Sequence, residues 1–295
     1  MEPHTDLPWT GERYVPTVTG DTALEHLHRY ALALRLAEGK RVLDVACGEG
    51  YGSRLLADKA ASVIGIDLDA KTVSHAQTRY ALPNLEFRQG DCAALPLPDA
   101  SIDLAVSFET LEHHAEHGAM LAELRRVLTP EGVLLISTPD RRHYSDERQY
   151  TNPFHVRELY AEEFRRLLLD HFPHASFHGQ RVVYGSLAVP FDGAGPFLSY
   201  SGDAEALVQD KGLAAPFYLL AVASAGPLPA LPASLFDGTA AWEKDSRALL
   251  QDLAEARDQL ARTRFQLECV YASVYWRITA PLRLLRKAAK RTLGI

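Results

Sequence analysis

The stretch VLDVACGEGYGS, Val42–Ser53, decides the fold of this chain. A run of apolar residues typical of a buried strand passes into a glycine-rich turn and then into a helical pattern. The glycines let the backbone approach a ligand closely, and the helix start offers free N–H groups. A dinucleotide site would need a third glycine where Ser53 follows Gly48 and Gly50. Asp44, inside the strand, instead favours a ligand that carries a cationic group.

Apolar runs typical of strands alternate with amphipathic runs typical of helices on both sides of this turn. The expected strands are 41–46, 62–67, 84–88, 102–108 and 132–138, with a closing pair around 176–184 and 217–223. The expected helices between them are 52–60, 70–80, 117–128 and 161–171. This alternation predicts an α/β fold with a doubly wound, seven-stranded, mostly parallel sheet. We expect one domain over residues 1–226.

Two further carboxylates follow neighbouring strands of the expected sheet. Asp67 closes the second strand, where a carboxylate can accept both hydroxyls of a ribose. Asp91 follows the third strand, where a carboxylate can take the amino group of an adenine. Each of them alone is also consistent with a helix cap. With Asp44 and the glycine turn they form an ordered set along one sheet edge, where ligands bind in open α/β sheets.

The segments Val42–Ser53, GIDLD, GDCAALPLPDASIDLAVSFETLEHH and GVLLISTP together resemble the successive motifs of class I S-adenosylmethionine-dependent methyltransferases, over roughly residues 25–226. The resemblance implies a Rossmann-like fold, methyltransferase activity and S-adenosyl-L-methionine as the cofactor. It places the methionine part at Asp44, Ala46, Gly48 and Gly50, the ribose at Asp67 and Leu68, and the adenine at Asp91 and Cys92, with Phe108 bordering the cofactor. Ala46 stands where the family usually has the first glycine of its loop. We expect a slight shift of the loop there without loss of binding.

Methyl transfer to oxygen requires alignment of the acceptor with the methyl group and can use a base for the hydroxyl proton. Histidine suits that role because its pKa lies near neutrality. In similar sugar O-methyltransferases of natural-product pathways, a histidine after the fourth strand is the proposed base. This implies His113, with Glu109 orienting it or the acceptor; the alternative is that ETLEHH is a structural turn. His113 and His117 have an i,i+4 spacing seen in zinc sites, but without a Glu or Cys partner we expect no essential metal.

Three other segments are candidates for the walls of the acceptor site. Relatives cover the cofactor with a helix before the first strand, which implies roles for His28 and Tyr30 in EHLHRYALA. The segment 152–168 places Asn152, His155 and Arg157 after the fifth strand, and we take His155 as a further catalytic candidate; helix capping by Asn152 is the alternative. The stretch 185–211 is expected to be an acceptor-binding flap or an idle insertion.

Beyond the domain, closely spaced prolines make 227–240 a semi-rigid linker. Residues 241–276 carry a heptad seam: Leu249, Leu253, Ala256, Leu260, Thr263, Leu267, Val270 and Val274. This seam favours a short coiled coil, pairing with itself or with a polysaccharide-assembly partner, over a lone amphipathic helix. In 277–295 basic and apolar residues fill opposite arcs of a helical wheel, the pattern of a helix on an anionic membrane or of a solvated surface helix.

The composition excludes several classes of protein. Of 295 residues, 47% are hydrophobic and 23% charged, which is globular rather than disordered composition. The net charge of −7 combines +6 after Glu268 with −13 before it, which disfavours nucleic acid as a partner. Three cysteines without framework or metal spacing suit a reducing compartment. With no secretory signal and no bilayer-spanning run, we expect a cytoplasmic protein with peripheral contact to the inner face of the membrane through 277–295.

The acceptor is suggested by the two ends of the chain. TGERYVP…EHLHRY and SVYWRITAPLR resemble segments of bacterial methyltransferases and glycosyltransferases associated with cell-surface polysaccharide assembly. The resemblance implies O-methylation of a sugar on a nascent polysaccharide or glycolipid. The alternatives are methylation of a small membrane-soluble molecule, such as a quinone precursor or natural product, and a non-catalytic scaffold of polysaccharide assembly.

Overall fold

The computed structural model describes residues 13–183, 199–202, 207–210 and 212–283. The chain divides into two compact units, Met1–Asp237 and Gly238–Ile295, and each is treated by itself below. Among the described residues no helix is both long and apolar enough to cross a membrane.

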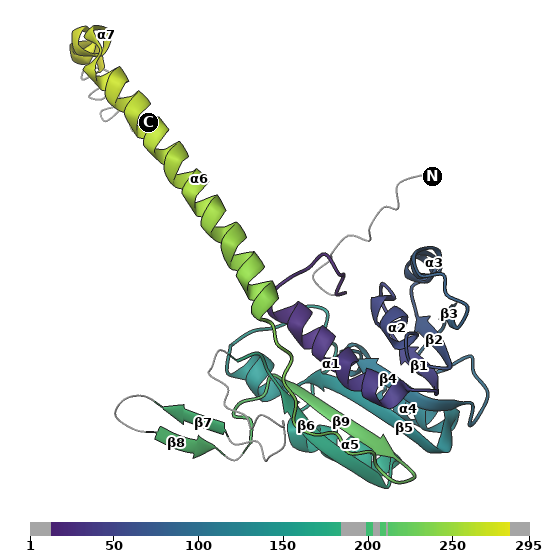
Figure 1. Cartoon of the computed structure of the whole chain (residues 1–295). Coiled ribbons are helices and arrows are strands. Elements are labelled where there is room, and N and C mark those ends of the chain that lie inside the picture. Colours follow the sequence, from purple (N-terminus) through teal and green to yellow (C-terminus); the bar gives the residue numbers. More distant parts are fainter. Residues whose placement is uncertain (1–12, 184–198, 203–206, 211, 284–295) are drawn as a thin grey trace. The chain divides into compact units, whose positions relative to one another are not determined.

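The first unit is built on a seven-stranded sheet in the order β3-β2-β1-β4-β5-β9-β6 (Figure 1). Its strands are β1 (Arg41–Val45), β2 (Ser62–Asp67), β3 (Leu85–Gln89), β4 (Ile102–Phe108), β5 (Leu128–Pro139), β6 (His174–Gln180) and β9 (Tyr218–Ser224). The first five are parallel to one another, and β9 runs antiparallel to both β5 and β6. The predicted doubly wound, seven-stranded α/β fold is confirmed.

The strands are apolar on both faces because helices cover both. In β4 the side chains of Leu104 and Val106 join one buried cluster while Ala105, between them, joins the other. This alternation is the period-2 pattern of a strand with a core on each side. The helices that supply these cores are α1 (Asp21–Ala37) and α2 (Tyr51–Leu56) on one face, and α4 (His117–Val127) and α5 (Ala161–His171) on the other.

Helix α3 (Ala70–Arg79) connects β2 to β3 and starts at a side-chain cap. The carboxylate of Asp69 accepts hydrogen bonds from the Lys71 N–H at 3.0 Å and the Thr72 hydroxyl at 2.7 Å. The cap satisfies a backbone donor that the first helical turn cannot pair. The Asp69 carboxylate is therefore occupied in capping α3, whereas Asp67 is the last residue of β2 and lies at the edge of the sheet.

Some element boundaries differ from those expected. Helix α2 ends at Leu56, earlier than the predicted residue 60, and β5 already begins at Leu128, before Pro130. The predicted flap at 185–211 lies largely outside the described residues; its described part is the hairpin of β7 (Ser199–Gly202) and β8 (Leu207–Asp210). In the predicted linker, Leu228 and Leu231 pack against the core cluster that includes α1, since apolar side chains between prolines still find a buried surface.

The second unit contains α6 (Thr239–Ala272) and α7 (Val274–Ile278). At Ser273 the backbone is extended, and the Ser273 hydroxyl accepts a hydrogen bond from the Trp276 N–H at 3.2 Å to cap α7. The predicted helix over 241–276 is therefore interrupted, and Val274 lies beyond the break in the seam. Of the basic residues expected on the amphipathic tail, Arg277 and Arg283 are described, and the others lie outside the described residues.

Candidate active site

The candidate site lies at the carboxyl ends of the parallel strands. Asp44 of β1 pairs in register with Gly65 of β2 and Val106 of β4, so the ends of these strands lie side by side. Asp67 ends β2 and Phe108 ends β4. In open α/β sheets this edge is where ligands bind. The three aspartates predicted as one ordered set therefore come from adjacent strands of one edge.

Asp44 is a buried carboxylate that lacks a cationic partner. Its side chain is 1% exposed and accepts hydrogen bonds from the Ser53 hydroxyl at 2.7 Å and the Tyr30 hydroxyl at 3.2 Å. In the part of the chain that the structure describes, no Lys, Arg or His forms an ion pair with it. Burial, opposed by these two hydroxyls, raises the pKa of Asp44 to about 7. A ligand that brings a positive charge to this position would supply what the carboxylate lacks.

The contrast with Glu49 in the same loop is informative. Glu49 is 3% exposed, but its carboxylate pairs with Arg79 at 2.9 Å and His75 at 3.3 Å and accepts a hydrogen bond from the Tyr80 hydroxyl. The Glu49 carboxylate is therefore paired with residues of α3, His75 and Arg79, and with Tyr80, which directly follows this helix. Glu49 holds the loop against α3, whereas Asp44 is left for a ligand.

The loop between β1 and α2 has the backbone conformation of a ligand cradle. Gly48 and Gly50 have φ values of 56° and 95°, the left-handed region that favours glycine. A side chain on Gly50 would also lie 2.9 Å from Ala76 and from Phe87. Ala46 adopts φ 57° as well. The non-glycine residue at this position is thus accommodated by a strained backbone, and the loop keeps the conformation that a glycine would give it.

Asp67 is held by two backbone donors. Its carboxylate oxygens accept hydrogen bonds from the Gly48 N–H at 2.9 Å and the Asp69 N–H at 3.0 Å. These bonds fix both oxygens and leave each with acceptor capacity for a pair of hydroxyls. Leu68, next along the chain, is 69% exposed. An apolar side chain exposed beside a fixed carboxylate suits a ligand that has both a ribose and a flat ring.

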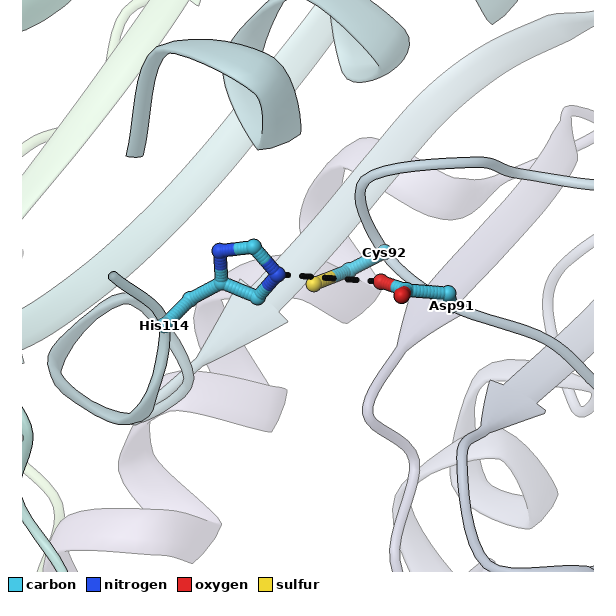
Figure 2. Close-up of side chains that lie close together, drawn as sticks. All are labelled: Asp91, Cys92 and His114. Carbon is cyan, nitrogen blue, oxygen red and sulfur yellow. Dashed lines mark ion pairs between the residues drawn. The ribbon is translucent and has the colours of Figure 1, made fainter. Parts of the chain in front are cut away.

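Asp91, Cys92 and His114 lie together at the end of the neighbouring strand (Figure 2). The Asp91 carboxylate accepts a hydrogen bond from the Ala93 N–H at 2.8 Å and lies 3.7 Å from His114 Nε2. One ligating atom of each residue could share a metal ion. Burial and the adjacent Asp91 carboxylate raise the pKa of the Cys92 thiol to about 11, so it stays protonated at neutral pH. The exposed Asp91 carboxylate can accept a hydrogen bond from a purine amino group.

Helix α1 places its two candidate residues, Tyr30 and His28, in different surroundings. The Tyr30 ring lies edge-on to Phe108 at 5.1 Å, and its hydroxyl donates to Asp44. His28 instead forms a 2.8 Å hydrogen bond with the Ser234 hydroxyl. Successive positions on a helix point in different directions, so two residues apart cannot both face the cofactor edge. Arg13 was missed by sequence reasoning, and its side chain lies over Gly48.

The segment after β4 carries the predicted acceptor-side residues. Glu109 has φ 52°, and its carboxylate accepts a 2.6 Å hydrogen bond from the Ser137 hydroxyl of β5. The carboxylate that lies 3.9 Å from His113 Nε2 belongs to Glu112, in the 3₁₀ turn η1 (Leu111–His113). Glu112 was not predicted to have a role, although it stands beside His113 in the same motif. Burial raises the pKa of Glu112 well above its usual range.

His155 is brought to His113 by backbone bonds. The N–H groups of Val156 and Arg157 both donate to the carbonyl of Glu112, at 2.8 and 3.0 Å. The two imidazole rings then lie edge to face with centroids 5.0 Å apart. The Nδ1–H of His155 donates to Glu158 Oε1 at 2.6 Å. Two predicted catalytic candidates from distant parts of the sequence therefore share one cluster, and Arg157 contributes to it through its backbone.

Asn152 orients this loop without capping a helix. Its Oδ1 accepts a hydrogen bond from the Phe154 N–H at 3.0 Å, and its amide donates to His155 Nε2 at 2.9 Å. Helix α5 begins later, after Tyr160, whose N–H donates to the Glu163 carboxylate. Tyr144, from the π-helical turn η2 (Arg142–Asp146), stacks on the His155 ring at 5.5 Å.

Arg29 is a buried cation that sequence reasoning missed. Its side chain is 1% exposed, donates to Gln180 Oε1 at 2.8 Å, and lies 4.3 Å from the centre of the Tyr218 ring. Its Nη1 lies 3.5 Å from the Glu109 carboxylate, but neither Nη1 nor Nη2 has a hydrogen-bond partner among the described residues. Glu25 and Arg29 are four residues apart in α1, a spacing that in sequence alone indicates an exposed ion pair.

The residues present fit S-adenosylmethionine. Its ammonium and sulfonium charges would meet the uncompensated Asp44 carboxylate, its ribose hydroxyls the fixed oxygens of Asp67, and its adenine the exposed Leu68 and Asp91. The remaining cluster of Glu112, His113 and His155 includes the turn η1, which follows β4 in the chain.

Comparisons with known proteins agree with this geometry. Residues 43–136 match the family model described as a methyltransferase domain. A probable S-adenosylmethionine-dependent methyltransferase of Mycolicibacterium smegmatis is 46% identical over 166 residues, which cover 55% of this chain and 63% of that protein. A fatty-acid O-methyltransferase of the same species is 34% identical over 128 residues, covering 40% of this chain and 47% of that protein. The chain thus spans less than two thirds of the length of these relatives.

A solved structure supports the fold. The complex between the Haloferax volcanii Trm112 methyltransferase activator and a putative methyltransferase contains a chain that matches with a TM-score of 0.50 and 21% identity. The match covers 72% of this chain and 91% of that one. None of these names refers to a polysaccharide, so the acceptor expected from the sequence stays a prediction. Residues 43–136 match the methyltransferase-domain model, and the first unit has the class I methyltransferase-like Rossmann fold that the sequence predicts.

Proposed function

We propose that the chain is an S-adenosylmethionine-dependent O-methyltransferase whose acceptor is a sugar of a bacterial surface polysaccharide or glycolipid. The observation that carries the methyltransferase part is Asp44, a buried carboxylate with no cationic partner among the described residues at the cofactor edge. The methyl group of the donor is already activated by the sulfonium charge. The protein therefore has to align two reactants and to deal with one proton.

The chain's own residues divide this work. S-adenosylmethionine held at Asp44 and Asp67 would supply a methyl group activated for displacement from sulfur. The cluster of Glu112, His113 and His155 would lie where the acceptor hydroxyl loses its proton. Tyr30 and Phe108, whose rings pack edge to face 5.1 Å apart, would border the donor. Glu109, fixed by Ser137, and Arg29, whose Nη1 forms an ion pair with Glu109 at 3.5 Å, would orient the acceptor.

A sugar acceptor is supported by the chemistry of these groups. The charged groups in this region are the carboxylates of Glu109 and Glu112 and the guanidinium of Arg29. Two aromatic rings, Tyr144 and Tyr218, lie in the same region with their centroids 5.9 Å apart. Carboxylates accept hydrogen bonds from sugar hydroxyls, and aromatic rings pack against the apolar face of a sugar ring. The resemblance of the chain's two ends to segments of polysaccharide-assembly enzymes supports the same class of acceptor.

A second candidate is methylation of a lipid, at a hydroxyl or carboxyl group. The observation that favours it is the 34% identity to a fatty-acid O-methyltransferase over 128 residues. A glycolipid acceptor is compatible with both candidates. A free membrane-soluble molecule, such as a quinone precursor, would share the lipid but lack the sugar.

The deciding experiment incubates the full chain with methyl-labelled S-adenosylmethionine and a membrane glycolipid extract, followed by acid hydrolysis. Label on a released monosaccharide supports the sugar acceptor, and label that stays in the organic-soluble fraction supports the lipid. Cofactor binding is measured in the same preparations with wild type and Asp44→Asn. Binding without any transfer would favour the scaffold hypothesis over the enzyme.

We further propose that 277–295 contacts an anionic membrane and that 241–276 pairs with itself or with an assembly partner. The membrane part rests on charge, since six basic and no acidic residues follow Glu268. It is tested by flotation with anionic vesicles, comparing the full chain with a chain that ends at residue 276. Equal flotation of the two proteins would contradict it.

A further inference from the structure

Two imidazoles and a buried carboxylate converge on the acceptor side of the site. One ligating atom from each of Glu112, His113 and His155 lies within 4.8 Å of the other two. Glu112 and His113 belong to η1, and His155 comes from the loop that follows η2. Since the backbone of that loop is bonded to the Glu112 carbonyl, the three side chains are held together by main-chain geometry.

The Glu112 carboxylate is incompletely satisfied. The side chain is 1% exposed, and its Oε2 accepts a 3.0 Å hydrogen bond from the Thr138 hydroxyl. Its Oε1 has no hydrogen-bond partner among the described residues and lies 3.9 Å from His113 Nε2. Leaving a buried carboxylate oxygen without a donor is costly, and a cation placed within the cluster would remove that cost.

Both imidazoles are oriented in the way that metal-binding histidines are. The Nδ1–H of His113 donates to the Phe154 carbonyl at 3.0 Å, and the Nδ1–H of His155 donates to Glu158 at 2.6 Å. Such bonds from one ring nitrogen fix the tautomer in which the other nitrogen carries the lone pair. In His155 that lone pair accepts the Asn152 amide, which would give up this bond to an ion.

We propose that Glu112, His113 and His155 bind a divalent transition-metal ion such as Zn²⁺ at the acceptor side of the methyltransferase site. Two imidazoles and one carboxylate suit first-row transition ions, whereas Mg²⁺ and Ca²⁺ prefer oxygen ligands alone. Three protein ligands leave coordination positions open for an acceptor oxygen. Resting on the proposed function, the ion would polarise the acceptor hydroxyl and promote the loss of its proton to water.

The second cluster of potential ligands serves as an internal comparison. Asp91, Cys92 and His114 also lie close enough to share an ion (Figure 2). However, the Asp91 side chain is 51% exposed, whereas Glu112 in the first cluster is 1% exposed. We therefore assign the ion to the cluster with the buried carboxylate and the fixed imidazoles.

The test measures metal binding directly on the full chain. After chelation and desalting, the protein is titrated with Zn²⁺ by calorimetry and with Co²⁺ by visible absorption, and binding of one ion per chain is expected. Glu112→Gln and His155→Gln should each abolish stoichiometric binding. Glu158→Gln, which alters only the partner of His155, should weaken it roughly 10- to 100-fold. His143→Gln is the matched control, an imidazole between Asp140 and Glu147 outside the cluster.

Thermal melts of all variants separate loss of binding from loss of folding. No stoichiometric binding by the wild type would overturn the proposal and leave the imidazoles as a metal-free base. Loss of binding in His114→Gln, with retention in Glu112→Gln, would also overturn it. S-adenosylmethionine binding is measured on the same samples. If the wild type binds the cofactor but no metal ion, only the metal proposal is refuted. If the wild type does not bind the cofactor, the proposed function is refuted.

Discussion

Asp44 couples the cofactor site to pH. In the protein without ligand, burial raises its pKa to about 7, so the carboxyl is protonated below neutral pH and ionised above it. A cationic ligand stabilises the ionised form, and binding below the raised pKa therefore releases a proton. The affinity for S-adenosylmethionine should rise as the pH increases through 7, by up to about tenfold per unit below that value.

Calorimetry at pH 6 and pH 8, in buffers of different ionisation enthalpy, measures both the affinity and the proton release. Asp44→Asn should bind the cofactor more weakly at pH 8 and lose most of the pH dependence. Asp103→Asn is the matched control, because this partly exposed aspartate of β4 pairs with Arg41 and not with the cofactor edge. An unchanged pH profile in Asp44→Asn would refute the coupling.

Ala46 shows that the loop conformation matters more than the glycine itself. With φ at 57° this alanine lies in a region that costs a non-glycine residue about 1–2 kcal/mol. Ala46→Gly should therefore raise the free energy of unfolding by up to about 1 kcal/mol, the strain relieved less the entropy that glycine loses. Ala57→Gly, at an ordinary helical φ of −62°, should lower it. Urea denaturation compares the two variants. A lower free energy of unfolding for Ala46→Gly than for wild type would contradict the claim that the backbone at Ala46 is strained.

At the scale of elements, α1 and α2 approach each other so closely that one position between them has to be glycine. A Cβ on Gly52 of α2 would lie 1.9 Å from the Tyr30 ring of α1. Gly52→Ala should therefore displace Tyr30 from Asp44, cost about 1–3 kcal/mol of stability and weaken cofactor binding.

The matched control for this packing is Gly118 of α4. Its nearest neighbour would be His171 Nε2, 4.0 Å from an added Cβ, so Gly118→Ala should be neutral or stabilising by up to about 1 kcal/mol. Thermal melts and cofactor titrations of the two variants give the answer. Equal stability of Gly52→Ala and Gly118→Ala would show that α1 and α2 can move apart to accommodate the added methyl group without loss of stability.

Helix α1 also buries an acid that weakens the fold at high pH. Burial, partly offset by Arg29, raises the pKa of Glu25 to about 7, above the value of about 4.3 expected when unfolded. A raised acid pKa costs nothing below the unfolded value, and the cost grows until the pH exceeds the folded value. Glu25→Gln should therefore be more stable relative to wild type at pH 8 than at pH 5, by on the order of 1–3 kcal/mol. The urea unfolding midpoints of both proteins at pH 5 and pH 8 test this prediction. The same difference in stability between variant and wild type at the two pH values would contradict it.

At the scale of the whole first unit, the sheet and the cofactor edge were predictable because their signals are local. Each of β1, β2 and β4 is a short apolar run followed at once by its functional residue, and parallel order brings the ends together. The acceptor cluster was predictable only in part. His113 and His155 were both candidates, but no local pattern indicates that a loop bonds to the Glu112 carbonyl and joins them.

Buried polar residues were the least predictable. Glu25 and Arg29 have the spacing of a surface ion pair, and only the packing of Tyr218 and Gln180 over them shows that they are inside. The neighbour of His113 was equally hard to predict. The sequence places His113 near His117, whereas the fold places it near His155.

The division of the chain leads to the last prediction. Residues 1–237 hold the whole sheet and cofactor edge, so this unit alone should fold and bind S-adenosylmethionine as the full chain does. Helix α6 carries exposed seam residues, among them Leu253 and Leu260, which are 46% and 69% exposed. Pairing of two helices would bury this apolar stripe and stabilise a dimer. Light scattering should therefore find residues 1–237 monomeric and the full chain dimeric. Leu253→Asp should dissociate the dimer, whereas Gln251→Asp, on the face of the helix away from the seam, should not. A monomeric full chain would contradict self-pairing and would mean that the seam binds a different partner.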